Sequence, residues 1–390
     1  MGYLIVNAGS SSLKMAWFCE QLERRLNALV DYHESPGMLR CWDSSGSESE
    51  IHRLPSEAEP MSAALEIIMA ECRNVFGADA VHTVGHRVVH GGTRYRAPVR
   101  LDETDITALA ALAPLAPQHQ PFNVAGIEAI ARAYPGLAQV ACFDTAFHQS
   151  QPEVVQRLAV PRIWFDQGVR HYGFHGLSYE YIAGRLGELD PAAATGRTIV
   201  AHLGHGASLC ALKNGRSIDT SMGFSTLDGL PMGTRCGRLD PGVLLYWLAQ
   251  GQAPETLRDV LYNHSGLLGV SGFSDDMRVL LASETAEAAE AIALFVYRCI
   301  AEIGALVAVL GGLDALVFTG GIGEHAAPIR ERIVAGLDWL GVRLDPRANA
   351  DGALGISRPD SVVRLWVVST DEEQVIAMHC RRLERVASGG

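Results

Sequence analysis

Lysine is nearly absent from this chain of 390 residues: Lys14 and Lys213 are the only two. The formal net charge is −12, and an acidic chain of this kind is not expected to present a nucleic-acid-binding surface. The eight cysteines include no CxxC pair and no Cys/His cluster at zinc-ligand spacing, which argues against the common zinc sites. We therefore expect reduced, mostly buried thiols.

Signals for export and for a membrane are also missing. The N-terminus lacks the basic and apolar regions of a signal peptide. No apolar run approaches the roughly 20 residues that a membrane-spanning helix needs. These absences predict a cytoplasmic protein that does not enter a membrane. There is also no GxxxxGK[ST] motif and no GxGxxG that opens a helix, so neither a P-loop nor a Rossmann site is expected.

The chain has enough length and apolar content for roughly two domains, with 48% hydrophobic and 19% charged residues. Its most informative stretch is residues 4–14, LIVNAGSSSLK, where an apolar strand runs into a loop of small residues and ends on Lys14. The loop amides, the serine hydroxyls and the lysine are all donors to phosphate oxygens. An ordinary serine-rich turn is the alternative for this loop taken alone.

Alternating strand and helix signals indicate an α/β fold. Strands are expected at residues 3–7, 13–19, 81–89, 139–143, 197–203, 313–318 and 364–368. Helices are expected at residues 60–75, 102–112, 122–133, 241–249, 256–261, 286–310, 328–340 and 372–386, and a loop or hairpin-rich region at 31–57. Residues 4–19 and 197–212 both follow the order strand, Gly/Ser loop, strand. This repeat indicates an internal duplication, with a ligand held between two similar domains.

Two more glycine-rich segments follow expected strands. HLGHGAS at 202–208 mirrors the first loop, and TGGIGEH at 319–325 lies between an expected buried strand and an expected helix. Glycine amides and a helix N-terminus favour an anion or a nucleotide. Either turn alone is more often structural, but three such loops at strand ends favour a nucleotide.

Four polar residues stand at expected strand ends or beside glycines: Arg87, Asp144, His175 and Arg235. Each alone is more often part of a structural ion pair. Together they supply what phosphoryl transfer to a carboxylate requires, because guanidinium groups bind both the acceptor and phosphoryl oxygens, and a histidine donates to the transferring group. Asn7 and the acids of STDEE near the C-terminus offer oxygen ligands for Mg²⁺.

The motifs NAGSSSLK, HRVVHGG, FDTAFHQ, YGFHG, HLGHGAS, DTSMGF with MGTRCG, SGLLGVSG, GGIGE and a C-terminal EE resemble the acetate kinase family. That family includes propionate kinases and belongs to the acetate and sugar kinase/Hsp70/actin superfamily. The resemblance runs from residue 3 to about residue 378, and only residues 20–60 lack it. It implies two actin-like (ribonuclease H-like) α/β domains related by duplication with a ligand cleft between them. The expected domains are residues 1–146 with 374–390, and residues 147–373.

The resemblance implies a role for each matching residue. Asp144 matches the residue that orients substrate and Mg²⁺, and His175 and Arg235 match transition-state stabilisers. Arg87 matches the arginine that binds the acyl carboxylate and the phosphoryl group. Asn7 and Glu372 match the positions that hold Mg²⁺ or Mn²⁺. The matches to ATP/ADP contacts are Lys14, His202, Leu203, Gly204, His205, Gly206, Asp276, Met277, Arg278, Gly320, Gly321, Ile322, Gly323 and Glu324.

The reaction implied is the reversible transfer of phosphate from ATP to acetate or another short-chain acid. Val89 and Phe174 match two apolar walls of the family's acyl pocket. Gln118 stands where the family has leucine, and Thr226 where it has proline. Burying such groups against a methyl costs roughly 1–3 kcal/mol unless they find a partner. These two positions therefore leave propionate or a more polar or larger acid as the alternative, but acetate is expected because the motifs that carry the chemistry are intact.

Four further positions depart from the family pattern. His205 and His325 replace asparagines on the nucleotide side, Arg238 replaces an aspartate, and Asp371 replaces an asparagine and adds a possible oxygen ligand near Mg²⁺. A competing class is a non-enzymatic actin- or Hsp70-like nucleotide switch, which has no need of the arginine and histidine set. The resemblance also implies a homodimer.

Overall fold

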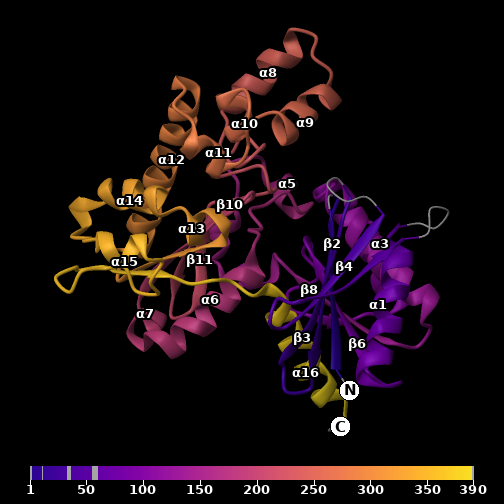
Figure 1. Ribbon diagram of the computed structural model, residues 1–390. Helices are drawn as coiled ribbons and strands as arrows, with labels where there is room; N and C mark the ends of the chain where they lie inside the picture. The colour runs from indigo at the N-terminus through magenta and orange to yellow at the C-terminus, as the bar shows by residue number, and fades with distance from the viewer. Residues whose placement is uncertain (1, 11, 33–36, 55–59, 389–390) are drawn as a thin grey trace. The chain divides into compact units, whose positions relative to one another are not determined.

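The structure is a computed structural model that describes residues 2–10, 12–32, 37–54 and 60–388. The chain divides into two compact units: unit 1 comprises residues 1–147 and 371–390, and unit 2 residues 148–370. Both ends of the chain therefore belong to unit 1, which is indigo to purple and yellow in Figure 1. Ser11 of the first loop, and parts of the 31–57 region, lie outside the described residues.

Unit 1 is built on an eight-stranded mixed sheet in the order β5-β4-β3-β2-β1-β6-β8-β7. Its strands are β1 (Gly2–Ala8), β2 (Ser12–Cys19), β3 (Arg24–Asp31), β4 (Met38–Asp43), β5 (Glu48–Arg53), β6 (Val81–Val88), β7 (Val99–Arg100) and β8 (Ala138–Phe143). β1 to β5 pair antiparallel in chain order, whereas β1, β6 and β8 are parallel. The carboxyl ends of these three parallel strands therefore meet at one edge of the sheet, which is where ligands commonly bind in open α/β sheets.

Helices cover both faces of this sheet. They are α1 (Pro60–Phe76), α2 (Glu103–Ala110), α3 (Gln120–Ala133) and α16 (Glu372–Ser388), with the short turns η1 (Ala113–Leu115) and η2 (Ala146–Ser150) at the ends of loops. Leu4 and Val84 belong to the core that α1 and α3 close. Gly85 faces the other way, and a Cβ there would lie 2.5 Å from Ile376 Cγ2 and 2.8 Å from Cys380 Sγ. The missing side chain thus lets α16 lie directly on the second face.

Unit 2 contains a five-stranded sheet in the order β11-β10-β9-β12-β13. Its strands are β9 (Arg197–Leu203), β10 (Ala207–Lys213), β11 (Arg216–Thr220), β12 (Ala315–Thr319) and β13 (Arg364–Val367). β9 pairs antiparallel with β10 and parallel with β12, as β1 does with β2 and β6. Both Asn214 and Gly215 have positive φ, as a two-residue hairpin turn requires. The repeated β2-β1-β6 and β10-β9-β12 arrangement agrees with the duplication expected from the sequence.

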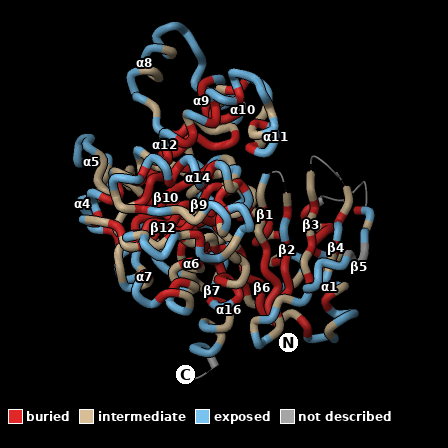
Figure 2. Tube along the Cα trace, turned by 60° about the vertical axis from the view of Figure 1, so that its left-hand side comes forward, coloured by how far each residue is buried: buried red, intermediate tan, exposed pale blue. Residues whose placement is uncertain are grey.

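Some helices of unit 2 cover this sheet, whereas the short helices of residues 241–282 lie beyond it, at the top of Figure 1. The helices of this unit are α4 (Glu153–Gln156), α5 (Arg162–Asp166), α6 (Gly176–Leu189), α7 (Pro191–Thr195), α8 (Pro241–Ala249), α9 (Pro254–Asn263), α10 (Gly266–Ser271), α11 (Met277–Ala282), α12 (Ala286–Leu310), α13 (Gly320–His325), α14 (Ala327–Ala335) and α15 (Pro346–Ala350), with η3 (Asp338–Leu340). The sequence did not predict α6, because Gly184 and Gly187 in its interior weaken the helical signal. Figure 2 shows buried residues concentrated in the strands.

Helix α12 corrects the expectation that no segment is long and apolar enough to cross a membrane. Among the described residues it is the one helix that meets both conditions. Arg298 and Glu302 divide its apolar residues into shorter runs. A search for one unbroken apolar run in the sequence therefore did not identify this helix as long enough to cross a membrane. Phe295, Cys299 and Ile303 are buried, and the helix packs against α10, α11 and α14. The core helix of a globular unit has the same length and composition, so this feature is weak evidence for a membrane.

Candidate functional site

In unit 1 the parallel strands place three predicted residues at one edge of the sheet. Asn7 lies near the end of β1, Arg87 near the end of β6, and Asp144 directly after β8. Across the β1–β2 hairpin, Asn7 stands opposite Lys14, whose side chain is exposed. The first loop therefore brings its lysine to the same edge as the residues on the parallel strands.

Arg87 is the centre of an ion-pair cluster at this edge. Its Nε lies 3.1 Å from Asp144 Oδ1 and its Nη2 lies 2.8 Å from Asp144 Oδ2, so the pair is bidentate. Glu372, the first residue of α16, places Oε2 3.5 Å from Arg87 Nη1. The side chains of Arg87, Asp144 and Glu372 are 20%, 2% and 14% exposed. Two carboxylates thus share one guanidinium in a mostly buried position.

The carboxyl group of Glu372 has an unusual pKa. The net effect of its surroundings raises this pKa from 4.5 to about 7. Burial is the largest cause, the charges of Arg87 and Lys14 lower the pKa, and the carboxylates of Asp144 and Glu373 raise it. A cation bound beside Glu372 would therefore favour the ionised carboxylate and lower this pKa.

The described residues contain no group of three or more His, Cys, Asp and Glu side chains arranged to hold a metal ion. Oxygen donors at this edge of the sheet come from the carboxylates of Asp144 and Glu372, which both contact Arg87, and from the amide of Asn7 near the end of β1. This donor set fits Mg²⁺, which prefers oxygen ligands, needs few of them from the protein and keeps several waters.

The start of α16 is fixed by a residue that sequence reasoning missed. Arg24 on β3 donates to Asp371 and lies 3.5 Å from Glu373, while its guanidinium stacks 5.0 Å from the Phe18 ring. The same oxygen of Asp371 accepts from the backbone N–H of Gln374 at 2.9 Å. Asp371, which the sequence suggested as a metal ligand, is thus engaged as a helix cap and ion-pair partner. Arg24 lies in the segment without family motifs, so nothing in the sequence pointed to it.

The ends of β1 and β6 are tied together beside this cluster. Asn123 on α3 donates to the carbonyl of Ala8 at 2.7 Å and accepts from the N–H of Val89 at 2.9 Å. Val89 is buried, as expected for the wall of an apolar pocket. Gln118 lies in the turn before α3 and is half-buried.

In unit 2, His175 is held by a chain of hydrogen bonds. It has the left-handed conformation (φ 56°) immediately before α6. Its Nδ1 lies 2.8 Å from Ser208 Oγ on β10, and that hydroxyl also bonds the buried Tyr179 hydroxyl. The ring stacks on His202 with centroids 4.3 Å apart, and Ser178 Oγ lies 2.9 Å from His202 Nδ1. Sequence reasoning missed Ser208 and Tyr179, although Tyr179 stands one helical turn from His175.

Arg235 and His175 converge on one point of the glycine loop after β9. A Cβ on Gly206 would lie 3.0 Å from Arg235 Nη2 and 3.3 Å from His175 Nε2. The other terminal nitrogen of Arg235 donates to the carbonyl of Thr226 at 2.9 Å. The buried Thr226 therefore orients the arginine through its backbone. Phe174, next to His175, is also buried.

The two glycine-rich segments of unit 2 are neighbours, because His202 pairs with Thr319 across β9 and β12. The expectation of a loop at TGGIGEH was wrong, since Gly320–His325 is itself the short helix α13. Gly320 has φ +76°, and a Cβ there would lie 2.8 Å from the carbonyl oxygen of Leu203. This close approach requires glycine. The N–H of Gly320 donates to Glu324 Oε1 at 2.9 Å, so Glu324 caps the helix from within.

The remaining predicted nucleotide contacts lie on the surface of unit 2. Asp276 caps α11 and holds Arg278 in an exposed ion pair, with Nε to Oδ1 at 3.0 Å. Met277 between them is buried. His205 Nε2 lies 3.1 Å from Asp275 Oδ2, also exposed. The other residues named from the sequence are Leu203 and Gly323, which are buried, Gly204 and Ile322, which are half-buried, and Gly321, His325 and Arg238, which are exposed.

Comparisons with known proteins agree on one family. The model of the acetokinase family matches residues 2–378. An acetate kinase of Rhodopseudomonas palustris is 51% identical over 397 residues, covering 99% of this chain and 98% of the relative. The structure of Porphyromonas gingivalis acetate kinase matches with a TM-score of 0.88 at 35% identity, covering 98% of this chain and 99% of that chain. A propionate kinase of Francisella tularensis matches with a TM-score of 0.89 at 33% identity, covering 96% and 98%.

Proposed function

The chain belongs to the acetokinase family, and from this premise we propose that it is an acetate kinase that transfers the terminal phosphoryl group of ATP to acetate, reversibly. The family resemblance and the actin-like α/β fold predicted from the sequence are confirmed by the relatives and solved structures. One observation within the site carries the proposal: Arg235 and His175 aim their donors at the same point of the Gly206 loop.

The chemistry needs positioning and charge neutralisation rather than a strong base. A carboxylate acceptor is already ionised at pH 7, and the transition state spreads negative charge over the phosphoryl oxygens. We assign to Arg87 the binding of acceptor and phosphoryl oxygens, and to Asp144 the orientation of that arginine through its bidentate pair. Arg235 and His175 stabilise the charge that develops on the phosphoryl group.

We assign the metal site to Asn7 and Glu372, with Asp144 beside them. Mg²⁺ bound there would neutralise charge on the phosphates during transfer. The nucleotide contacts are assigned to the loop His202–Gly206, to α13 and to the start of α11, with Lys14 for the phosphates. In α13 the Glu324 carboxylate occupies the first amide, so a phosphate there would have to displace or share it.

The direct test is formation of acyl phosphate, trapped with hydroxylamine as the hydroxamate. Acetate, propionate, butyrate, glycolate and lactate are offered with ATP or pyrophosphate as donor. We expect product with ATP and the highest kcat/KM with acetate. No product with any pair would favour the nucleotide switch. A higher kcat/KM with propionate or a hydroxy acid would favour the alternative that Gln118 and Thr226 suggest, and the structural match to a propionate kinase keeps this alternative in view.

Removing the Ser208 hydroxyl tests how His175 is held. Ser208→Ala should lower kcat about ten- to a hundredfold, because His175 Nδ1 loses the partner that fixes the ring and the tautomer. The KM values for ATP and for acetate should stay within roughly threefold of those of the unaltered enzyme, because Ser208 is not proposed to contact either substrate. Steady-state kinetics beside Ser361→Ala, whose hydroxyl donates to a loop carbonyl elsewhere in unit 2, gives the comparison. Equal kcat in the two variants would contradict the role of Ser208.

The raised pKa of Glu372 predicts metal binding that depends on pH. A proton and a metal ion compete for this carboxylate, so the affinity should fall up to about tenfold per pH unit below the pKa of about 7. Mn²⁺ binding to the nucleotide-free protein, followed by electron paramagnetic resonance at pH 6, 7 and 8, measures this. Glu372→Gln should bind Mn²⁺ weakly at every pH. Equal affinity of the unaltered protein at pH 6 and pH 8 would refute the assignment.

The same shift has a stability consequence of known sign. The folded pKa of Glu372 lies above its ordinary value of 4.5. This group therefore contributes stability that is fully present below about pH 4.5 and is lost as the pH rises through 7 in the absence of metal.

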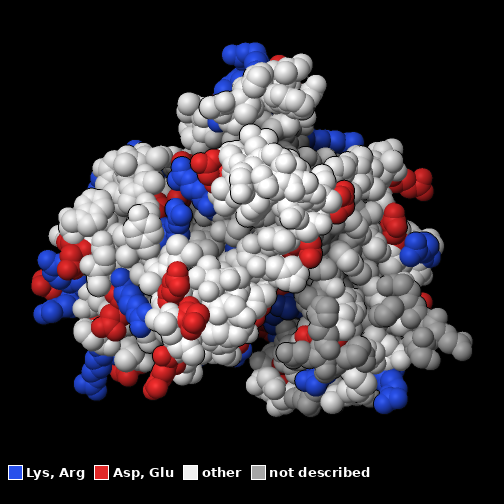
Figure 3. All heavy atoms as spheres, turned by 90° about the horizontal axis from the view of Figure 1, so that it is seen from above, with Lys and Arg blue, Asp and Glu red and all other residues white. Residues whose placement is uncertain are grey.

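We propose that the enzyme is a homodimer that uses α8. Its Leu245, Tyr246 and Leu248 are 68%, 62% and 43% exposed, and none of its residues is buried. Figure 3, which views the molecule from the α8 end of Figure 1, shows few charged side chains on the nearest surface. Exposed apolar patches commonly mark interfaces. Sedimentation equilibrium should give twice the chain mass of 41.9 kDa, and Leu245→Glu should give monomers, unlike Val154→Glu on α4. A monomeric unaltered protein would contradict this.

We also place the enzyme in the cytoplasm. All eight cysteines are free thiols, and six of them are buried. Free thiols persist where the surroundings are reducing.

A further inference from the structure

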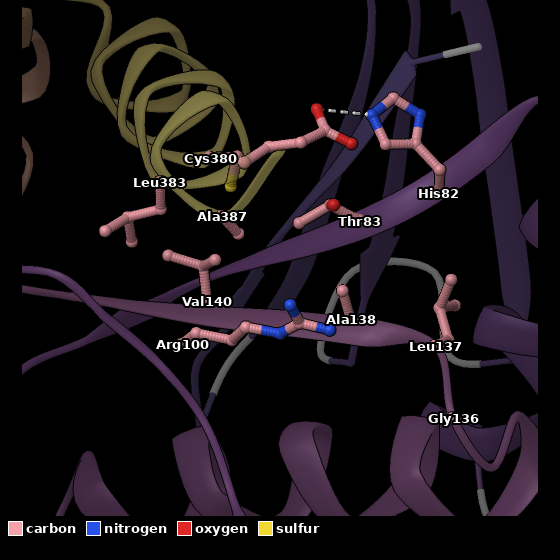
Figure 4. A pocket seen from close by; sticks show the side chains of 11 residues that line it. His82, Thr83, Arg100, Gly136, Leu137, Ala138, Val140, Cys380, Leu383 and Ala387 are labelled. Atoms are coloured by element: carbon pink, nitrogen blue, oxygen red, sulfur yellow. Dashed lines mark hydrogen bonds and ion pairs between the residues drawn. The ribbon is translucent and has the colours of Figure 1, made fainter. Parts of the chain in front are cut away.

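A second pocket lies in unit 1, away from the residues discussed so far. It has a volume of about 400 Å³. β6, β7, β8 and the later turns of α16 line it (Figure 4). His82 and Thr83 stand near the start of β6 and Ala138 at the start of β8, whereas Arg87 and Asp144 stand at the other ends of these strands. The pocket therefore opens at the opposite edge of the sheet from the proposed catalytic residues.

Two polar groups in its wall have no partner within the described part of the chain. Thr83 is only 5% exposed, lines the pocket, and its hydroxyl makes no hydrogen bond with a described residue. Arg100 on β7 is exposed, and no carboxylate among the described residues pairs with it. The Thr83 hydroxyl lines the pocket and is free to hydrogen-bond water or a ligand there, and the buried His82 Nδ1 in the same lining also lacks a partner among the described residues.

The acidic group of the pocket is engaged within its wall. Glu384 on α16 lies 2.9 Å from His82 Nε2 and accepts from the Tyr3 hydroxyl at 3.0 Å. The dashed line at His82 in Figure 4 marks the first of these contacts. Glu384 is thus held by two hydrogen bonds in the wall, whereas no carboxylate among the described residues forms an ion pair with Arg100. Leu137, Val140 and Leu383 supply apolar surface in a lining that is otherwise largely polar.

We propose that this pocket binds a monocarboxylic acid with a hydrocarbon body larger than that of acetate. Arg100 binds the carboxylate, Thr83 donates its hydroxyl to the same group, and Leu137, Val140 and Leu383 cover the hydrocarbon. The volume falls within the range of small-molecule sites, roughly 300–1,000 Å³, and exceeds what a two-carbon acid fills. α16 begins at Glu372, the proposed metal ligand, and its later turns line the pocket. A bound acid would therefore contact the same helix that carries this ligand.

Binding of hexanoate and of phenylacetate to the full chain, measured by calorimetry with excess acetate present, tests the proposal. We expect saturable binding of at least one acid and a rise in melting temperature. Arg100→Gln and Thr83→Val should weaken it about tenfold or more, since each removes a hydrogen bond to a charged group. Arg96→Gln, an exposed arginine of the preceding loop, should bind as the unaltered chain does. Hexan-1-ol and hexylamine should not bind, because Arg100 selects an anion.

Three outcomes would overturn the proposal: no binding of either acid, displacement by acetate, or equal affinity in Arg100→Gln. Displacement by acetate would place the acid in the catalytic site instead. The measurement needs no turnover, so its failure is distinct from failure of the acetate kinase assignment, which the hydroxamate assay decides. Arg100→Gln should retain acetate phosphorylation.

Discussion

Replacing Arg235 by alanine should lower kcat by about 100- to 1,000-fold, the scale on which a single preorganised donor to a developing oxyanion acts. The guanidinium is held in advance: one nitrogen donates to the Thr226 carbonyl, and the other faces the Gly206 loop. In the proposed mechanism it therefore stabilises charge that appears during transfer without first reorganising. KM for ATP should change by less than roughly threefold, because the lost interaction belongs to the transition state. Steady-state kinetics in both directions measures this.

Two companion variants make the result specific. Arg235→Lys keeps the charge but not the forked geometry, so it should recover only part of the rate. Arg258→Ala removes an exposed arginine from α9 and should leave kcat unchanged. A near-normal kcat for Arg235→Ala would remove this residue from the mechanism.

Replacing Arg87 by methionine should damage both stability and catalysis. Asp144 and Glu372 would lose the guanidinium they share, and Asp144 is almost wholly buried. Removing one partner of a buried pair costs roughly 3–5 kcal/mol, and the 20% exposure of Arg87 favours the lower end, about 3 kcal/mol. The two carboxylates repel each other less once Glu372 is protonated. The loss of stability should therefore be smaller at pH 5 than at pH 8.

Urea denaturation at the two pH values, with acetate kinetics at pH 8, checks this prediction. The matched control is Arg132→Gln, which removes an exposed arginine 4.0 Å from Glu128 one helical turn away. Such surface pairs contribute about 0.5 kcal/mol or less. If Arg87→Met loses no more stability than this control, then Asp144 and Glu372 do not depend on Arg87 to offset their charges.

The sequence was most informative where the chemistry needs small residues and charges at strand ends. The hairpins at both glycine loops, the parallel strands and the closing helix all appear within a few residues of their expected places. The apolar residues of these strands follow one another within a few positions, so the local sequence pattern was sufficient to locate the strands. The grouping of Arg87, Asp144 and Glu372 followed from strand order and from the family resemblance together.

What the sequence could not predict depends on contacts between distant residues. Arg24 and Asp371 form an ion pair although 347 positions separate them in the sequence. Nothing in the sequence around either residue indicates which partner it has. The sequence therefore suggested Asp371 only as a possible oxygen ligand and not as the partner of Arg24 and cap of α16. The link from Tyr179 through Ser208 to His175 joins α6 to β10 and is equally invisible in a linear pattern. The helix at Gly320–His325 was missed because three glycines within it suggest a loop.

The closure of unit 1 by α16 has a consequence for synthesis of the protein. A ribosome makes the first 147 residues of unit 1 early, but α16 emerges only after all of unit 2, residues 148–370. At 5 to 20 residues per second this delay is on the order of tens of seconds. During that time the face around Gly85 lacks its helix, and Arg87 and Asp144 lack Glu372. The nascent chain should therefore carry an incomplete form of the proposed phosphoryl-transfer site until α16 has been made.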